Sequence, residues 1–340
     1  MKLPLIQHKT FGEETDIKLM LEKPQDIVER GVDFLLDTRL SHAWPHALIR
    51  AFRFKNKIRS FQQDLVRMAL TVDLEGNFRD TENSSVAVAF LPTFDLWCNM
   101  RNIQSTIFIQ GSIVKQISPY RDILTAHDIG LHGLHHEVWG RSRWWQYSLK
   151  YSGLSLSEKE DRLQKALSIF REENLPPPRH FRAPYLNING PTLSLLAKYG
   201  FVSDSSAASY LGCLPIPQKK SGLWELPVTT RPFPDKVNYG LQRFYYPEFS
   251  LGALLKTPIN VTIDTINLVS TLQKQYGYTP HIVILMHPWE FTSNTGVSHA
   301  SEKNYDKLGA LLDQLQEHFK ILPVTMTDLT LQVSTAEKLI

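Results

Sequence analysis

Two acidic residues stand at the end of an apolar stretch of the chain, in the sequence LTVDLEG. Asp73 and Glu75 are two residues apart, so on an extended chain both carboxylates face the same side. Two acids at the end of a buried strand are costly unless a cation or a base holds them. The pair therefore predicts a cation site or an acid–base site, with an ordinary turn or helix-capping role as the alternative.

Histidines follow a second apolar stretch, in the sequence DIGLHGLHHE. His132 and His136 are four residues apart, so one helical turn would bring both imidazoles to one side. Two imidazoles and a carboxylate, from Asp73 or Glu75, form a three-ligand set that leaves a position open for water, as in catalytic metal sites. His135 is the competing partner of His132, and local hydrogen bonding alone is the alternative role for these side chains.

Two further segments place a proline just after a polar strand end. In FRAPY the proline keeps the residue before it out of helical geometry and has no N–H, so Tyr185 supplies the next amide donor. Arg182 could hold a catalytic carboxylate in bidentate fashion, or could be a buried ion-pair partner. In ILMHPWE, His287 ends a buried strand and is a candidate general acid, although a lone histidine at a strand end is usually structural.

These residues need elements that bring them together. From residue 67 onward, short β-rich apolar stretches alternate with segments of helical periodicity, which predicts a mostly parallel sheet or barrel with helices outside. In such barrels the chemistry lies at the carboxyl ends of the strands, where the candidate residues fall. Strands are expected at 67–73, 105–110, 129–132, 180–182, 201–204, 223–228, 282–287 and 320–324. Helices are expected at 93–103, 157–173, 191–199, 264–276 and 302–319.

One expected helix carries a starting signal. Ser157 stands three residues before Glu160, which is the spacing of a capping box. The first part of the chain differs from the rest: residues 24–36 have helical spacing, and residues 47–61 mix apolar side chains with basic ones such as Arg50. A basic amphipathic stretch can contact anionic lipid or a phosphorylated substrate, but is more often a solvated helix face. We expect three parts: a helical extension over 1–66, a barrel over 67–330 and a tail over 331–340.

Composition limits the class of protein. The chain has 340 residues, of which 42% are hydrophobic and 21% charged, so it can bury a large core. Its 37 Lys and Arg against 34 Asp and Glu are too balanced to indicate a nucleic-acid partner. Two cysteines cannot form a disulfide framework, which fits a reducing compartment. No apolar stretch nears the ~20 residues of a membrane span and no signal peptide is visible, so we expect a cytoplasmic protein, with peripheral membrane contact as an alternative.

Taken in this order and spacing, the segments resemble the polysaccharide deacetylase family, whose catalytic domain is the NodB homology domain. TVDLEG resembles the family's first motif in its Asp-x-Glu variant, and HGLHH resembles His-Ser/Thr-x-x-His, with Gly133 at the hydroxyl position. RAPY resembles Arg-x-Pro-Tyr, and LMH with the following PWEF resembles the Leu-x-His motif of a subgroup. DSS and WELP are similar to two further family segments. The resemblance covers about 67–330 and does not reach the first 66 residues.

The resemblance implies a distorted, TIM-like (β/α) barrel of about seven strands. It implies a hydrolase that removes an N-acetyl or N-formyl group from an amino sugar in a glycan, a lipid-linked or a nucleotide-linked carbohydrate. It also implies a divalent metal, Zn²⁺ first, with Co²⁺, Ni²⁺ or Mn²⁺ as alternatives. Three residues would bind the metal: Glu75, His132 and His136.

The resemblance also implies catalytic roles. Asp73 would be the general base, oriented by Arg182, and His287 would be the general acid that protonates the departing amine. The amide of Tyr185 would help to stabilise the oxyanion. Three apolar side chains would line the pocket of the acyl group: Leu285, Trp224 and Trp289.

Two other functions stay open on the sequence. Glu75 stands where the family more often has a metal-binding Asp, and some members with similar first motifs hydrolyse small cyclic or formyl amides, or work without a metal. A metal-independent amidohydrolase of the same fold is therefore one alternative, and a catalytically silent carbohydrate-binding barrel is the other. A cytoplasmic location would favour a nucleotide-linked or lipid-linked sugar over a mature cell-wall polymer as substrate.

Overall fold

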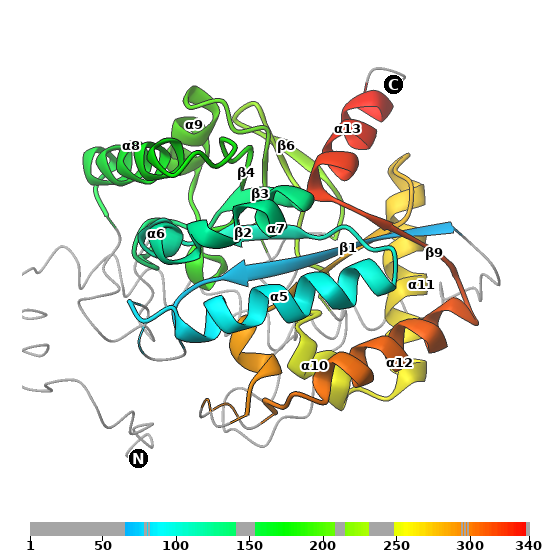
Figure 1. Cartoon of the computed structure of the whole chain (residues 1–340). Helices are drawn as coiled ribbons and strands as arrows, with labels where there is room; N and C mark the ends of the chain where they lie inside the picture. The colour runs from blue at the N-terminus through cyan, green and yellow to red at the C-terminus, as the bar shows by residue number, and fades with distance from the viewer. Residues whose placement is uncertain are drawn as a thin grey trace, which may run out of the picture.

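The computed structural model describes residues 65–77, 80, 82–140, 154–207, 215–230, 248–293, 295, 297 and 299–337. Within these ranges nine strands form one sheet in the order β6-β7-β5-β4-β3-β2-β1-β8, with β9 paired to β1 (Figure 1). Every pairing is parallel except that of β6 with β7. The expected α/β barrel is confirmed, with nine strands rather than about seven. The expected helical extension and its basic stretch lie outside the described residues.

The elements that carry the argument have the following bounds. The strands are β1 (Leu65–Leu74), β2 (Thr106–Ile109), β3 (Asp128–Leu131), β4 (His180–Phe181), β5 (Ser203–Asp204), β6 (Gln218–Lys220), β7 (Leu223–Glu225), β8 (His281–Met286) and β9 (Lys320–Val324). The helices are α5 (Ser85–Met100), α6 (Val114–Ile117), α7 (Arg121–Ala126), α8 (Leu156–Glu172), α9 (Gly190–Lys198), α10 (Leu251–Lys256), α11 (Ile259–Gln275), α12 (Asn304–Gln316) and α13 (Met326–Glu337). Two 3₁₀ turns matter below, η4 (Pro184–Leu186) and η7 (Pro288–Phe291).

Strand β1 pairs with β2, β8 and β9, and both of its faces are buried. Val72 and Leu74 belong to the outer apolar core beneath the helices, whereas Ala69 belongs to the cluster inside the barrel. Because side chains alternate along a strand, Asp73 shares the inner face with Ala69. A strand buried on both sides is nearly all apolar, so its single acid at position 73 stands out.

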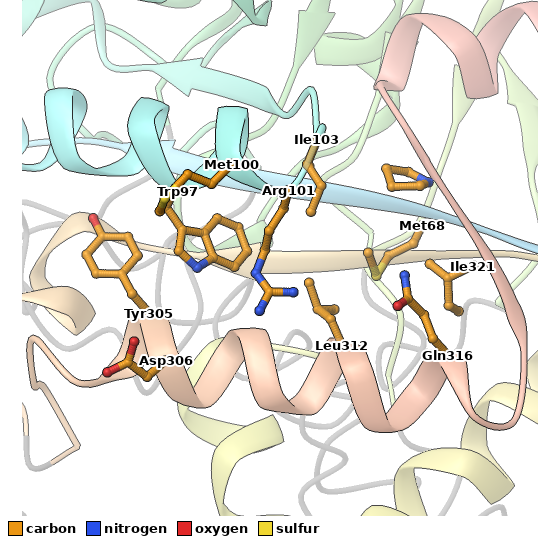
Figure 2. Close-up of a pocket in the computed structure, with 11 residues that line it drawn as sticks. Met68, Trp97, Met100, Arg101, Ile103, Tyr305, Asp306, Leu312, Gln316 and Ile321 are labelled. Carbon is orange, nitrogen blue, oxygen red and sulfur yellow. The ribbon is translucent and has the colours of Figure 1, made fainter.

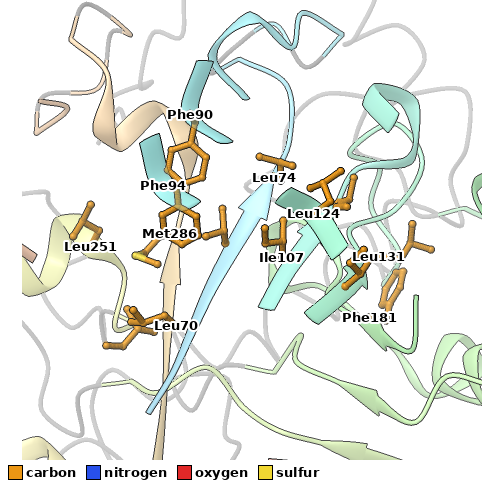
Figure 3. Packing of buried hydrophobic residues seen from close by; sticks show 14 of the residues in the cluster. Leu70, Leu74, Phe90, Phe94, Ile107, Leu124, Leu131, Phe181, Leu251 and Met286 are labelled. Carbon is orange, nitrogen blue, oxygen red and sulfur yellow. The ribbon is translucent and has the colours of Figure 1, made fainter. Parts of the chain in front are cut away.

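Helix α5 covers the outer face of the sheet beside β1 (Figure 1). Its rings of Phe90 and Phe94 stack at 4.7 Å between centroids, and both belong to the apolar cluster that includes Met286 of β8 and Ile107 of β2 (Figure 3). Burying each such ring contributes roughly 1.5–3 kcal/mol, so this layer fixes β1 firmly against its neighbours. The strand end that carries Asp73 is therefore a rigid platform.

The barrel is closed by single hydrogen bonds rather than by a strand ladder. After β7 the chain crosses to β8, where Thr229 N–H donates to the carbonyl of Val283 (3.1 Å) and Val283 N–H donates to Thr229 Oγ1 (2.9 Å). Higher on β8, Leu285 N–H donates to the carbonyl of Phe249 (2.8 Å). This irregular closure accounts for the distortion of the barrel.

Two local expectations need correction. The N-cap of helix α8 lies two residues earlier than expected: it is Ser155, whose Oγ accepts from Glu158 N–H (3.3 Å), and Glu158 Oε2 accepts from Ser155 N–H (2.8 Å). The expected box of Ser157 and Glu160 is wrong because Ser157 already lies inside the helix. Strand β6 was not expected because its residues Gln218–Lys220 are polar.

The C-terminal part of the barrel continues past the expected boundary. Helix α13 runs to Glu337, so most of the residues expected as a tail continue this helix. Its first turn is tied to the amino-terminal end of β3, where Thr327 N–H donates to Asp128 Oδ2 (3.1 Å). The three-part division of the chain remains a prediction. In the described part of the chain no helix is both long and apolar enough to span a membrane.

Candidate active site

The candidate residues meet at the carboxyl ends of neighbouring strands. Asp73 is the last residue but one of β1 and Glu75 follows that strand; His132 follows β3, Arg182 follows β4 and His287 follows β8. The parallel registers of β1 with β2, β2 with β3 and β3 with β4 bring these ends to one rim of the barrel. These side chains therefore lie at the carboxyl ends of the strands, as expected from the sequence.

Three of them form a compact cluster of ligand atoms. Oε2 of Glu75 lies 2.5 Å from Nε2 of His136 and 3.1 Å from Nε2 of His132. One ligand atom from each residue lies within 4.8 Å of the others. Two imidazole nitrogens and one carboxylate oxygen are a donor set that suits zinc and the later first-row divalent metals. Among the described residues, Glu75, His132 and His136 are the side chains that together could hold a metal ion.

The second nitrogen of each imidazole has a partner, and for His132 that partner fixes the tautomer. Nδ1 of His132 lies 2.9 Å from the carbonyl oxygen of Arg182, which can only accept, so this Nδ1 carries the proton. Nδ1 of His136 lies 3.1 Å from Oη of Tyr185. Nε2 of His132 and Nε2 of His136 both face Glu75: when protonated they donate to its carboxylate, and in the neutral Nδ1–H tautomer each presents a lone pair there. Both rings are thus oriented as metal ligands are.

The carboxyl group of Glu75 is held in its ionised form. Burial alone would raise its pKa, but the charge of His136 and the hydrogen bonds of His132 and His136 outweigh burial and lower the pKa below its usual value. A carboxylate ionised near neutral pH is what a cation site needs.

The loop that joins the two histidines is not the helical turn that the spacing suggested. Gly133 has φ +71° and His136 has φ +59°, both in the left-handed region. A Cβ added to Gly133 would lie 2.7 Å from Nε1 of Trp139. The resemblance puts a hydroxyl residue here, but this backbone admits only glycine without strain.

A buried acid holds that loop in place. Glu137 accepts backbone N–H groups of Leu134 (3.2 Å) and His135 (2.5 Å). His135 itself turns outward, with Nδ1 3.3 Å from Oε1 of Glu82, and is 40% exposed. The structure therefore resolves the choice of partner for His132 in favour of His136.

Asp73 is held by Arg182, which is fully buried. Nη1 of Arg182 donates to Oδ1 of Asp73 (2.9 Å) and to Oγ1 of Thr71 (2.7 Å), while Nε and Nη2 donate to the carbonyl (3.1 Å) and Oγ (2.9 Å) of Ser205. Of the two alternatives considered for Arg182, the bidentate hold on a carboxylate is not seen at Asp73, because Nε and Nη2 of the guanidinium bond Ser205. Oδ2 of Asp73 is on the side of the candidate metal ligands, 3.9 Å from Nε2 of His132.

His287 stands at the start of η7 with a buried acid beneath it. Its ring stacks on Trp289 at 4.3 Å between centroids, and Nδ1 lies 3.5 Å from Oε2 of Glu290. Burial would lower the pKa of His287, but the hydrogen bond and charge of Glu290, with the charges of Glu75 and Asp73, raise it to about 9. The imidazole is therefore a cation at neutral pH and can give up a proton.

The other predicted residues have mixed positions. Tyr185 lies in η4 with φ 61°, and its ring meets that of His136 edge-on at 4.6 Å between centroids. Leu285 is buried in β8 beside Thr71. Trp224 lies deeper in the barrel, in an apolar cluster with Val283 and residues of α13. Their roles as pocket residues, like that of Trp289, stay predictions.

The sequence reasoning gave no role to two acids that the structure places behind the site. Glu137 fixes the histidine loop, and Glu290 accepts from the backbone N–H of His287 (2.9 Å) and from that of Gly252 (3.0 Å). The spacing of three between His287 and Glu290 is that of a capping box and could have indicated the contact.

A cavity of about 530 Å³ lies elsewhere, between the end of α5 and helix α12 (Figure 2). Trp97, Arg101 and Tyr305 are among the residues that line it, and none of the predicted site residues does. Arg101 forms an ion pair with Asp313, with Nη1 2.8 Å from Oδ1. The cavity is thus separate from the acids and histidines at the barrel rim.

Comparison with known proteins finds a family match for part of the chain. Residues 69–203 match the family model described as polysaccharide deacetylase. These residues belong to the polysaccharide deacetylase family. The resemblance found in the sequence is thereby confirmed over these residues, and the match supports the expectation of a hydrolase acting on carbon–nitrogen bonds other than peptide bonds.

Solved structures agree with the polysaccharide deacetylase fold. A Mycobacterium smegmatis protein described as a polysaccharide deacetylase is 20% identical with a TM-score of 0.54, over 82% of this chain and 93% of that one. A Pseudomonas aeruginosa PAO1 protein described in the same way is 12% identical with a TM-score of 0.51, over 78% and 90%. PuuE allantoinase is 10% identical with a TM-score of 0.51, over 79% and 90%. At these identities the likeness establishes the fold alone. No curated protein matches the chain.

Proposed function

We propose that this protein is a divalent-metal-dependent hydrolase that removes an N-acetyl group from an amino sugar. The observation that carries the proposal is the convergence of Glu75, His132 and His136 on one point, with their ligand atoms within 4.8 Å of one another. Oδ2 of Asp73 lies beside that point, 3.9 Å from Nε2 of His132. Hydrolysis of an unactivated amide needs a group that activates water and a base that takes its proton. A cation site beside a second acid can supply both.

The donor set fits the metal that the family implies. Glu75 would supply one oxygen, and His132 and His136 would each supply Nε2, since their Nδ1 atoms are occupied by Arg182 and Tyr185. A bound divalent cation would supply Lewis acidity and lower the pKa of the attacking water from ~15.7 to ~7. The expectation of Zn²⁺, with Co²⁺, Ni²⁺ or Mn²⁺ as alternatives, is part of the proposal.

The chain's own residues carry the proton transfers. Oδ1 of Asp73 is fixed by Arg182, so Oδ2 is the oxygen that accepts the proton of the attacking water. The N–H of Tyr185 is the donor that we assign to the developing oxyanion, an effect worth ~3–4 kcal/mol. His287, kept protonated by Glu290 beneath it, delivers a proton to the departing amine.

The substrate class completes the proposal. We propose a nucleotide-linked or lipid-linked N-acetylated sugar, turned over in the cytoplasm or at its membrane surface, with Leu285 and Trp289 beside the acyl group. Support comes from the family and from the buried Leu285 next to Thr71 on β1.

Acetate release tests the proposal. Purified protein is offered a nucleoside-diphosphate N-acetylhexosamine, a lipid-diphosphate N-acetylhexosamine, an N-acetylglucosamine oligomer and a cyclic ureide, each with and without a chelator. We expect acetate from a sugar substrate, loss on chelation, recovery with Zn²⁺ and activity near background for Asp73→Asn. Hydrolysis of the ureide that survives chelation would instead establish the metal-independent amidohydrolase. Sugar binding without any hydrolysis would establish a silent barrel.

A further inference from the structure

Two buried acidic side chains stand side by side on the neighbouring strands β5 and β7. Asp204 of β5 and Glu225 of β7 are partners in the parallel register of these strands. Their exposed fractions are 0% and 1%. Two buried carboxyl groups in contact cannot both be ionised without a large free-energy cost, unless cations neutralise them.

The hydrogen bonds around the pair leave one oxygen without a donor. Oδ1 and Oδ2 of Asp204 accept from the hydroxyl (2.6 Å) and the backbone N–H (3.1 Å) of Ser206. Oε1 of Glu225 accepts from the N–H of Ala207 (3.0 Å). Oε2 of Glu225 is buried and has no donor among the described residues. Carboxyl groups placed side by side in this way can bond each other only when one of them holds a proton.

Charged groups on the neighbouring strands do not neutralise the pair. Lys220 of β6 acts on both acids from a distance, and no described lysine or arginine forms an ion pair with either of them. His180 of β4 bonds Oγ of Ser203 (2.7 Å), and Arg182 beyond β4 is paired with Asp73. Burial raises the pKa of both acids, and the charge of Asp204 raises that of Glu225 further.

We infer that Asp204 and Glu225 share a single proton and act as positioning residues, holding the chain at Ser205 and Ser206 so that Arg182 points at Asp73. The inference rests on the proposed function, in which Asp73 is the base. A pair with one proton carries one negative charge, and the lone pairs of Asp204 that face Ser206 are then available as acceptors.

Hydrogen bonds link the pair to the site in two steps. Ser206 Oγ, which donates to Asp204, accepts from the N–H of Ala183 (2.8 Å). The adjacent Ser205 accepts two bonds from the guanidinium of Arg182, at its carbonyl (3.1 Å) and its Oγ (2.9 Å). The same guanidinium donates to Asp73. A shift of the strand end by a fraction of an ångström would therefore be passed on to the base.

Three variants of the full chain separate a shared proton from simple packing. In Glu225→Gln the amide donates permanently to Asp204 and its oxygen still accepts from Ala207. Glu225→Ala removes both bonds. Glu160→Gln is the matched control, since Glu160 pairs with Lys198 on the outer helices. Each variant is measured for metal content, kcat and KM of acetate release, its infrared carboxyl bands, and unfolding by urea from pH 5 to 9.

The expected results are specific to a shared proton. Glu225→Ala should lose at least about tenfold in kcat with metal content unchanged, and Glu225→Gln should restore kcat to within about twofold. The infrared band of a protonated buried carboxyl should be present in wild type and Glu160→Gln and absent in Glu225→Gln. The folded acid keeps its proton above the unfolded pKa of about 4.3. As the pH rises from about 5 to about 9, the unfolding constant of wild type should therefore increase relative to that of Glu225→Gln, by up to about tenfold per pH unit.

The contrary results are equally clear. A wild type without the protonated-carboxyl band, or with an unfolding constant parallel to that of Glu225→Gln at all pH values, overturns the shared proton. Should Glu225→Ala fail to fold, a Glu225→Gln variant with kcat near background and full metal content overturns the positioning role. Wild type that releases no acetate contradicts the proposed function, yet the infrared and unfolding measurements still decide the shared proton.

Discussion

Nη1 of Arg182 lies 2.9 Å from Oδ1 of Asp73, and no more than 4% of either side chain is exposed. The ion pair is buried, and the guanidinium also lies over the ring of Phe108, 4.2 Å from its centroid. Removing one partner of a buried pair leaves the other charge without compensation, which costs about 3–5 kcal/mol. The position of the proposed base, Asp73, therefore depends on Arg182.

Arg182→Lys should lower kcat by about 100-fold or more, because an ammonium group cannot bond Asp73 and Ser205 at once. Steady-state acetate release gives kcat, and elemental analysis should find the metal retained. The matched control is Arg101→Lys, whose surface pair with Asp313 is worth about 0–1 kcal/mol. An Arg182→Lys enzyme within threefold of wild type would mean that Asp73 needs no such partner.

The protonation of His287 should depend on Glu290. In metal-free protein, an NMR titration of His287 should give a pKa near 9 in wild type and a lower pKa in Glu290→Gln, because burial is then opposed only by the charges of Glu75 and Asp73. The raised pKa stabilises the fold fully below pH ~6.5, and this contribution is lost as the pH rises through about 9. Glu82→Gln, on the surface, should leave the titration unchanged. An unshifted His287 in Glu290→Gln would disprove the contact.

Gly133→Ala should destabilise the protein by about 1–3 kcal/mol, because the residue has φ +71° and an added Cβ would lie 2.7 Å from Nε1 of Trp139. Urea unfolding followed by circular dichroism measures the change. Gly190→Ala is the control, since its Cβ would meet nothing within 4 Å. Equal stability of the two variants would show that the histidine loop adopts another backbone conformation.

Ser155→Ala should cost about 1 kcal/mol of unfolding free energy, because it removes the N-cap of helix α8. Ser157→Ala, inside the same helix, should change the stability by less than about 0.5 kcal/mol. Thermal or urea unfolding of both variants checks the helix start. A larger loss of stability in Ser157→Ala than in Ser155→Ala would indicate instead that Ser157 is the N-cap, as the sequence alone suggested.

Much of the barrel and the identity of the site residues follow from local patterns. The apolar strand that ends in Asp73 and the HGLHH segment are readable because strand period and ligand spacing are short-range properties. The polar strand β6 has no such signal. Nor does a spacing of four distinguish a helical turn from the loop with left-handed residues that joins His132 to His136.

Contacts between distant segments are the part that sequence patterns could not supply. A bidentate hold of Arg182 on a carboxylate was one of two alternatives, but Ser205 bonds Nε and Nη2 of the guanidinium because β5 ends beside β4. The pairing of Asp204 with Glu225 depends in the same way on the register of β5 and β7. Strand register is a property of the folded sheet, so it becomes visible only in three dimensions.

The central claim is that Glu75, His132 and His136 hold one divalent cation. Isothermal titration of metal-free protein with Zn²⁺ tests it most directly, with His136→Ala and His135→Ala as a matched pair, because His135 faces Glu82 instead of the cluster. We predict about one ion per chain for wild type and His135→Ala, and at least about 100-fold weaker binding for His136→Ala. Wild type without a zinc site, or a His136→Ala variant that binds zinc like wild type, would contradict it.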